Sequence, residues 1–127
     1  MKQIVLDMQS TLYARALSRI LVQELDGYQV IISESPDITK KRCELIHPYA
    51  LLMEVNAYSP WRLSDRLATR RLIKDNSPDC KIVLLVNDNA DRSIADDVKR
   101  AKRDGLIDAF LYSSVSDSYL AAMMDSL

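Results

Sequence analysis

The order of apolar segments limits the fold of this chain more than any other feature of the sequence. Short runs rich in Val, Ile, Leu and aromatic residues alternate with longer stretches that have helical spacing. The short runs are almost continuously apolar, which is typical of strands covered on both faces. They span residues 3–8, 28–33, 49–55, 81–86 and 108–114. The helical stretches span residues 10–25, 36–46, 60–75, 91–104 and 116–127.

Local signals support these helices. Ser10 is suited to cap the first helix, and the next apolar residues recur at every fourth position to form one ridge. The ridge residues are Tyr13, Leu17, Leu21 and Leu25.

Two prolines mark further helix starts, because the first turn of a helix tolerates proline. Pro36 follows Ser35 and Pro60 follows Ser59, so we expect each serine to act as an N-cap. Gly105 follows a basic last turn and suits a left-handed C-terminal position.

Five strand-helix repeats with short connections predict a parallel sheet with right-handed crossovers and helices on both faces. The length of 127 residues fits a single domain spanning residues 1–127. In such sheets, binding and catalytic residues gather where the strands end. Those positions hold Asp7, Glu54, residues 86–88, Ser113 and Ser114.

Composition excludes several classes of function. The formal net charge is -1, so no overall field attracts nucleic acid or an anionic membrane. No membrane-length apolar run and no signal peptide is present, which predicts a cytoplasmic protein. Cys43 and Cys80 have no metal-ligand spacing, and the two glycines, Gly27 and Gly105, cannot build a phosphate-binding loop. We therefore expect no metal and no cofactor.

The segments "KQIVLDMQS" and "LLMEVNAYSP" resemble the receiver domain of two-component response regulators, and the resemblance covers the whole chain. It implies the flavodoxin-like (βα)5 fold, a three-layer α/β sandwich with strand order 2-1-3-4-5. Asp7 matches the first acid of the family's acidic pair, whereas Met8 replaces the second. Glu54 takes the position of the phosphoacceptor aspartate, and Asn56 that of the residue whose carbonyl helps to hold magnesium.

The last two strands also depart from the family pattern. The fourth should end in Ser or Thr and offers Val86 or, with a shift of one residue, Asn87. In the fifth, Phe110 matches the switch aromatic residue, Ser113 replaces the invariant lysine and Ser114 replaces the proline that follows it.

Each departure impairs phosphoryl transfer for a physical reason. A thioether at Met8 is a poor magnesium ligand, and the hydroxyl of Ser113 carries no charge to pair with a phosphoryl group. The longer side chain of Glu54 displaces the acceptor oxygens. We therefore interpret the chain as an atypical receiver, a signalling module rather than an enzyme.

Two readings of Glu54 stay open. It provides a permanent negative charge in place of a phosphorylated aspartate, or it is a solvated residue left at a strand end. We expect Asp7 to be its close neighbour, so that the two carboxylates repel each other.

Basic residues recur every fourth position in the third helical stretch. They are Arg62, Arg66, Arg70 and Lys74. This spacing predicts one exposed ridge, which we interpret as a solvated helix face, with Asp65 as a local counter-ion. A nucleic-acid or acidic-partner site is the alternative that we consider weaker.

The resemblance implies protein partners, among them a second copy of the chain, that dock on the surface of the fourth helix, fifth strand and fifth helix. In this chain that surface includes Tyr112, Tyr119 and Met123, whereas Leu120 and Met124 are expected in the core. The competing hypothesis is a flavodoxin-like protein or enzyme that binds a small ligand or a metal with Asp7, Glu54 and the hydroxyls of Ser113 and Ser114.

Overall fold

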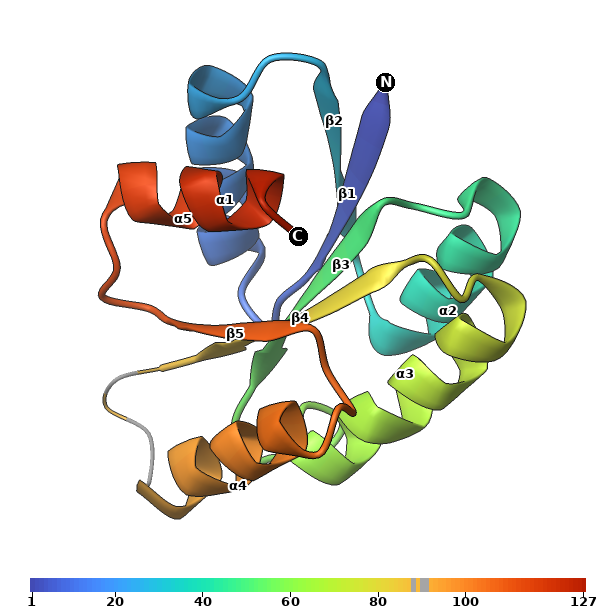
Figure 1. Cartoon of the computed structure of the whole chain (residues 1–127), viewed down its shortest axis with the longest axis vertical. Helices are drawn as coiled ribbons and strands as arrows, with labels where there is room; N and C mark the ends of the chain where they lie inside the picture. The colour runs from blue at the N-terminus through green and yellow to red at the C-terminus, as the bar shows by residue number, and fades with distance from the viewer. Residues whose placement is uncertain (88, 90–91) are drawn as a thin grey trace.

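The structure is a computed structural model that describes residues 1–87, 89 and 92–127. It contains a five-stranded parallel sheet in the order β2-β1-β3-β4-β5, as predicted (Figure 1). The strands are β1 (Lys2–Asp7), β2 (Tyr28–Ser33), β3 (Ala50–Val55), β4 (Lys81–Val86) and β5 (Ala109–Tyr112).

Helices cover both faces of this sheet, which makes the fold the predicted three-layer α/β sandwich of the flavodoxin-like class (Figure 1). They are α1 (Thr11–Glu24), α2 (Pro36–Ile46), α3 (Leu63–Asn76), α4 (Arg92–Arg103) and α5 (Asp117–Asp125). Helices α1 and α5 pack on one face, and α2, α3 and α4 pack on the other. None of the described helices combines the length and the apolar character needed to cross a membrane.

The predicted N-caps of α1 and α2 are confirmed. The hydroxyl oxygen of Ser10 accepts a hydrogen bond from the Tyr13 amide at 3.2 Å, and that of Ser35 accepts one from the Ile38 amide at 3.2 Å. Gly105 has a φ of 77°, as expected for the left-handed position after a helix.

The predicted start of α3 is wrong. The helix begins at Leu63, and Pro60 lies in a turn closed by the hydrogen bond from the Trp61 amide to the Tyr58 carbonyl, 2.8 Å. The carboxylate of Asp65 accepts from the amide of Arg62, 3.2 Å, which satisfies one of the free amides at the helix start.

The sheet separates two apolar clusters, because successive side chains of a strand point to opposite faces. On the α1 and α5 face, the predicted ridge of α1 packs against Leu52, Leu85, Leu120 and Met124. The other cluster, on the α2, α3 and α4 face, contains both cysteines. The predicted burial of Leu120 and Met124 is confirmed.

Cys43 and Cys80 are free thiols, each 1% exposed. Burial raises the pKa of Cys43 to about 12 and the pKa of Cys80 to about 11. At pH 8 the native thiols should react with dithionitrobenzoate at least about a hundredfold more slowly than in urea, because the thiolate is the reactive form.

The same shifts predict a pH dependence of stability. Both folded pKa values lie above the unfolded value of about 8.5. The contribution of the two thiols to the free energy of unfolding should therefore be constant below about pH 8.5 and should fall as the pH rises above that value. Urea titrations of the protein and of a Cys43→Ala/Cys80→Ala variant between pH 7 and pH 10 test this. Rapid stoichiometric labelling of the native thiols at pH 8 would contradict the raised pKa values from which both predictions follow.

Candidate functional site

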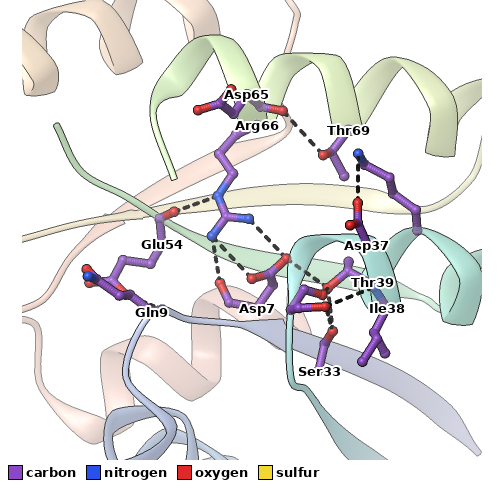
Figure 2. A network of polar contacts seen from close by, with 12 residues as sticks. Asp7, Gln9, Ser33, Asp37, Ile38, Thr39, Glu54, Asp65, Arg66 and Thr69 are labelled. Atoms are coloured by element: carbon purple, nitrogen blue, oxygen red, sulfur yellow. Dashed lines mark hydrogen bonds and ion pairs between the residues drawn. The ribbon is translucent and has the colours of Figure 1, made fainter. Parts of the chain in front are cut away.

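The central feature at the carboxyl edge of the sheet is an ion pair between Asp7 of β1 and Arg66 of α3, with each residue 1% exposed. Nη1 of Arg66 lies 3.0 Å from Oδ2 of Asp7, and Nη2 donates to Oδ1 at 3.3 Å and to the Asp7 carbonyl at 3.1 Å. Nε donates to the carbonyl of Glu54 at 2.8 Å. The guanidinium therefore joins α3 to two adjacent strands (Figure 2).

The same carboxylate is bound from α2. The hydroxyl of Thr39 donates to Oδ2 of Asp7 at 2.8 Å and lies 2.5 Å from the hydroxyl oxygen of Ser33. Ser33 in turn donates to the carbonyl of Ser35 at 3.0 Å. Thr39 and Ser33 are buried, so the polar groups around Asp7 form a buried network that spans α2, β1, β2 and α3 (Figure 2).

Glu54 does not face Asp7, so the expected repulsion between the two carboxylates is wrong. Asp7 pairs in register with Met53, one residue before Glu54, and its side chain points to the α2 and α3 face. The side chain of Glu54 points away from Arg66 toward Gln9 (Figure 2). It lies on the opposite face, together with its register partner Leu85.

Glu54 is held by the β1–α1 connection. Its Oε1 accepts a hydrogen bond from the backbone amide of Gln9, 2.8 Å. The side chain of Asn56 donates to Oε1 of Gln9, also 2.8 Å, and accepts from the Tyr58 amide. The resemblance assigns Glu54 and Asn56 to the phosphorylation site, and both residues bind Gln9.

Glu54 also lines a cavity of about 320 Å³ at this edge of the sheet. The other lining residues are Ser10, Tyr13, Leu85, Asn87 and Ser113. The structure thus brings together Glu54, Asn87 and Ser113, as the sequence predicted, and leaves Asp7 outside the cavity lining. Ser114 is exposed and is not among the lining residues.

Magnesium, which the resemblance implies at such a site, does not fit the residues present. Met8 is 6% exposed and packs into the α1 and α5 cluster, and the carboxylate of Asp7 is already bound by Arg66 and Thr39. Within residues 1–87, 89 and 92–127, no three His, Cys, Asp or Glu side chains are placed to hold a metal ion. A hard divalent cation requires several oxygen ligands, and this donor set does not supply them.

The remaining positions that the resemblance assigns to the switch lie within or directly after β4 and β5. Val86 is buried with the α2, α3 and α4 cluster, so Asn87 is the polar residue that reaches the cavity; residue 88 lies outside the described part of the chain. Phe110 is partly buried and packs edge-on against Tyr112, with ring centroids 5.9 Å apart. Ser113 donates its amide to the Val86 carbonyl, 2.9 Å, which continues the β4–β5 pairing.

The predicted basic ridge of α3 is not one exposed surface. Arg66 faces the sheet, Arg70 is partly buried, and Lys74 lies 3.3 Å from the carboxylate of Asp108. Arg62 is exposed and has the expected counter-ion, Asp65, at 3.6 Å. Because an α-helix has about 3.6 residues per turn, each step of four residues rotates the side chain slightly past one full turn. Arg62 and Arg70 therefore lie on either side of the direction in which Arg66 points.

Arg66 is the site residue whose role the sequence analysis missed. A signal was present, since Leu63, Arg66, Thr69 and Ile73 follow the three- and four-residue spacing of an inward helix face. An arginine at such a position indicates a buried anionic partner, because an unpaired charge in a core is costly.

An open groove of about 570 Å³ runs along β5 between α4 and α5. Its lining includes Phe110, Tyr112 and Tyr119, with Lys102 at the α4 side. Tyr119 is 57% exposed, whereas Met123 is partly buried against the core. Two of the three residues predicted for an interaction surface, Tyr112 and Tyr119, therefore share this groove.

No protein-family model matches the sequence, and no curated protein matches it either. Solved structures do match over almost the whole chain. A receiver domain protein from Clostridium thermocellum is 13% identical with a TM-score of 0.79, covering 99% of this chain and 93% of that one. A LuxR-family DNA-binding response regulator from Staphylococcus aureus is 11% identical with a TM-score of 0.77, covering 99% and 98%.

A third structure, a response regulator from Burkholderia pseudomallei with a phosphorylated aspartic acid and a calcium ion, is 20% identical with a TM-score of 0.73. The match covers 98% of this chain and 66% of that one. Identities this low establish the fold and leave the activity to be argued from the site. This chain therefore has the fold of response regulator receiver domains, with a buried Asp7–Arg66 pair at the carboxyl edge of its sheet.

Proposed function

We propose that this chain is an atypical receiver domain, a signalling module that acts through protein contacts without phosphoryl transfer to Glu54. The observation that carries the proposal is the closed Asp7–Arg66 pair. In it, an acid that the resemblance assigns to the magnesium site is neutralised within the protein and bound by Thr39 as well.

The groups around Glu54 also suit a fixed carboxylate better than a phosphoryl acceptor. One carboxylate oxygen accepts from the Gln9 amide, so attack by that oxygen on a phosphoryl donor would break the hydrogen bond. Ser113 lines the cavity where the resemblance places a lysine, and a hydroxyl provides no positive charge for the transferred group. Glu54 is in this proposal a permanent anion that ties β3 to the start of α1.

The groove along β5 is the surface on which we place the protein contacts. Aromatic side chains that are partly exposed supply much of the binding energy in protein interfaces, and Tyr112 and Tyr119 are of this kind. The exposed ring of Tyr119 provides apolar area beside the amphipathic side chain of Lys102. A second copy of the chain or an effector domain is the expected occupant.

Incubation with acetyl phosphate and magnesium tests the central claim. We expect no mass increase of one phosphoryl group on intact protein under conditions that label a receiver with the complete set of acids and lysine. Sedimentation velocity should give the same oligomeric state with and without the phosphoryl donor.

The matched control is Glu54→Gln, which removes the charge and retains an oxygen that can accept from the Gln9 amide. Labelling of the unaltered chain that disappears in this variant would overturn the proposal. Labelling that survives in it would place the modification elsewhere and leave Glu54 unmodified, as proposed.

A further inference from the structure

The edge strand β2 is open along its outer side. It is the terminal strand of the order β2-β1-β3-β4-β5, so alternate backbone amides and carbonyls have no partner strand there. Its sequence, YQVIIS, contains neither proline nor a charged residue. Edge strands that are not used for pairing usually carry such protection.

Helix α2 presents a continuous stripe of side chains next to this edge. The stripe consists of Ile38, Lys41, Arg42, Leu45 and Ile46, which follow the spacing i, i+3, i+4, i+7 and i+8 of one helix face. With Ile31 of β2 they line a groove of about 400 Å³. The groove is therefore lined by four apolar and two basic side chains, and it includes one residue of β2.

The charged residues in this lining are both basic, Lys41 and Arg42. Throughout the described residues, neither Lys41 nor Arg42 has a carboxylate within ion-pair distance, whereas Lys40 pairs with Asp37 at 3.8 Å. Leu45 is 81% exposed, the largest exposure among the large apolar side chains after Met1. An apolar groove with unpaired cations complements an apolar segment that carries acidic residues.

We propose that this groove binds an extended acidic segment of a partner protein, which adds to the sheet as a sixth strand beside β2. A strand in that place lies about 4.8 Å from β2 and points alternate side chains toward α2. Its apolar side chains contact Ile31, Ile38 and Leu45, and an acidic residue pairs with Lys41 or Arg42. An extended segment can also form main-chain hydrogen bonds with the outer side of β2, which a helix in the groove cannot, so an extended segment fits better.

This site is separate from the β5 groove of the proposed function, since β2 and β5 are opposite edges of the sheet. Failure of one proposal therefore leaves the other intact.

The test uses a fluorescein-labelled peptide of alternating valine and threonine with aspartate at both ends. Fluorescence anisotropy at low salt should show saturable binding, and amide shifts in NMR spectra should concentrate in β2 and α2. A peptide with proline at its centre should bind at least about tenfold more weakly, because it cannot complete the ladder.

Charge reversal supplies the matched comparison. Lys41→Glu/Arg42→Glu should weaken binding about tenfold, as expected when an attractive charge pair is replaced by like-charge repulsion, and a peptide with lysine at its ends should restore it. Arg15→Glu/Arg19→Glu makes the same change of charge on exposed positions of α1 and should leave the affinity unchanged.

Three results of the binding experiments would overturn the proposal. They are no saturable binding of the acidic peptide, equal losses in both charge-reversal variants, and shifts centred on β5. A dimer in sedimentation experiments that Leu45→Glu dissociates would also overturn it, because the groove would then belong to a second copy of the chain.

Discussion

Replacing Arg66 with methionine is expected to lower the free energy of unfolding by about 3–5 kcal/mol. The guanidinium and the carboxylate of Asp7 are both buried, and methionine would leave that carboxylate without its counter-charge. The substitution also removes the hydrogen bonds to two backbone carbonyls, those of Asp7 and Glu54. Urea unfolding followed by circular dichroism measures the loss.

Two variants separate the ion pair from the size of the side chain. Arg70→Met makes the same replacement one turn later in α3, at a partly buried position whose Nε has no hydrogen-bond partner in the described structure, and should cost less than about 1 kcal/mol. Adding Asp7→Asn to Arg66→Met removes the orphaned charge and keeps an acceptor for Thr39. That double variant should recover a large part of the loss; no recovery would mean that packing, not charge, dominates.

Replacing Thr39 with valine should lower the free energy of unfolding by about 1–3 kcal/mol. Valine has nearly the same shape but cannot donate to Oδ2 of Asp7, and it leaves the neighbouring hydroxyl of Ser33 with one partner fewer. Because both residues are buried, water cannot replace the lost hydrogen bonds without opening the interface between α2 and the sheet.

Thr69→Val is the matched control for this prediction. Thr69 is equally buried and lies on α3, yet its hydroxyl donates to the Asp65 carbonyl of its own helix, 3.3 Å away. Its loss should cost less than about 1 kcal/mol, since that carbonyl is also part of the helix hydrogen-bonding pattern. Similar losses in the two variants would show that the network around Asp7 adds no stability of its own.

The fold was predictable from the sequence because local and long-range signals agree. Apolar runs of strand length, serine caps and helical stretches recur in the same order along the chain, and a parallel sheet with two helical layers satisfies all of them. The start of α3 was not predictable in this way, because Ser59 and Pro60 are residues typical of a helix start but lie in the preceding turn. The cap is instead made by Asp65 from inside the helix.

The location of the site was predictable from the sequence, but the directions of its side chains were not. Strand ends identified Glu54, Asn87 and Ser113, which do line one cavity. The face to which each carboxylate points depends on the register between β1 and β3, and a change of one residue reverses it. Asp7 is aligned with Met53, so its side chain meets α3, and the burial of Arg66 follows from that register.

The buried pair also limits how the sequence of this protein can vary. Asp7 and Arg66 are 59 positions apart, and losing either one alone leaves a charge in the core, whereas losing both together is tolerable. Related chains should therefore retain or lack the two residues jointly, and a single exchange at either position should be rare in any lineage that inherits this core.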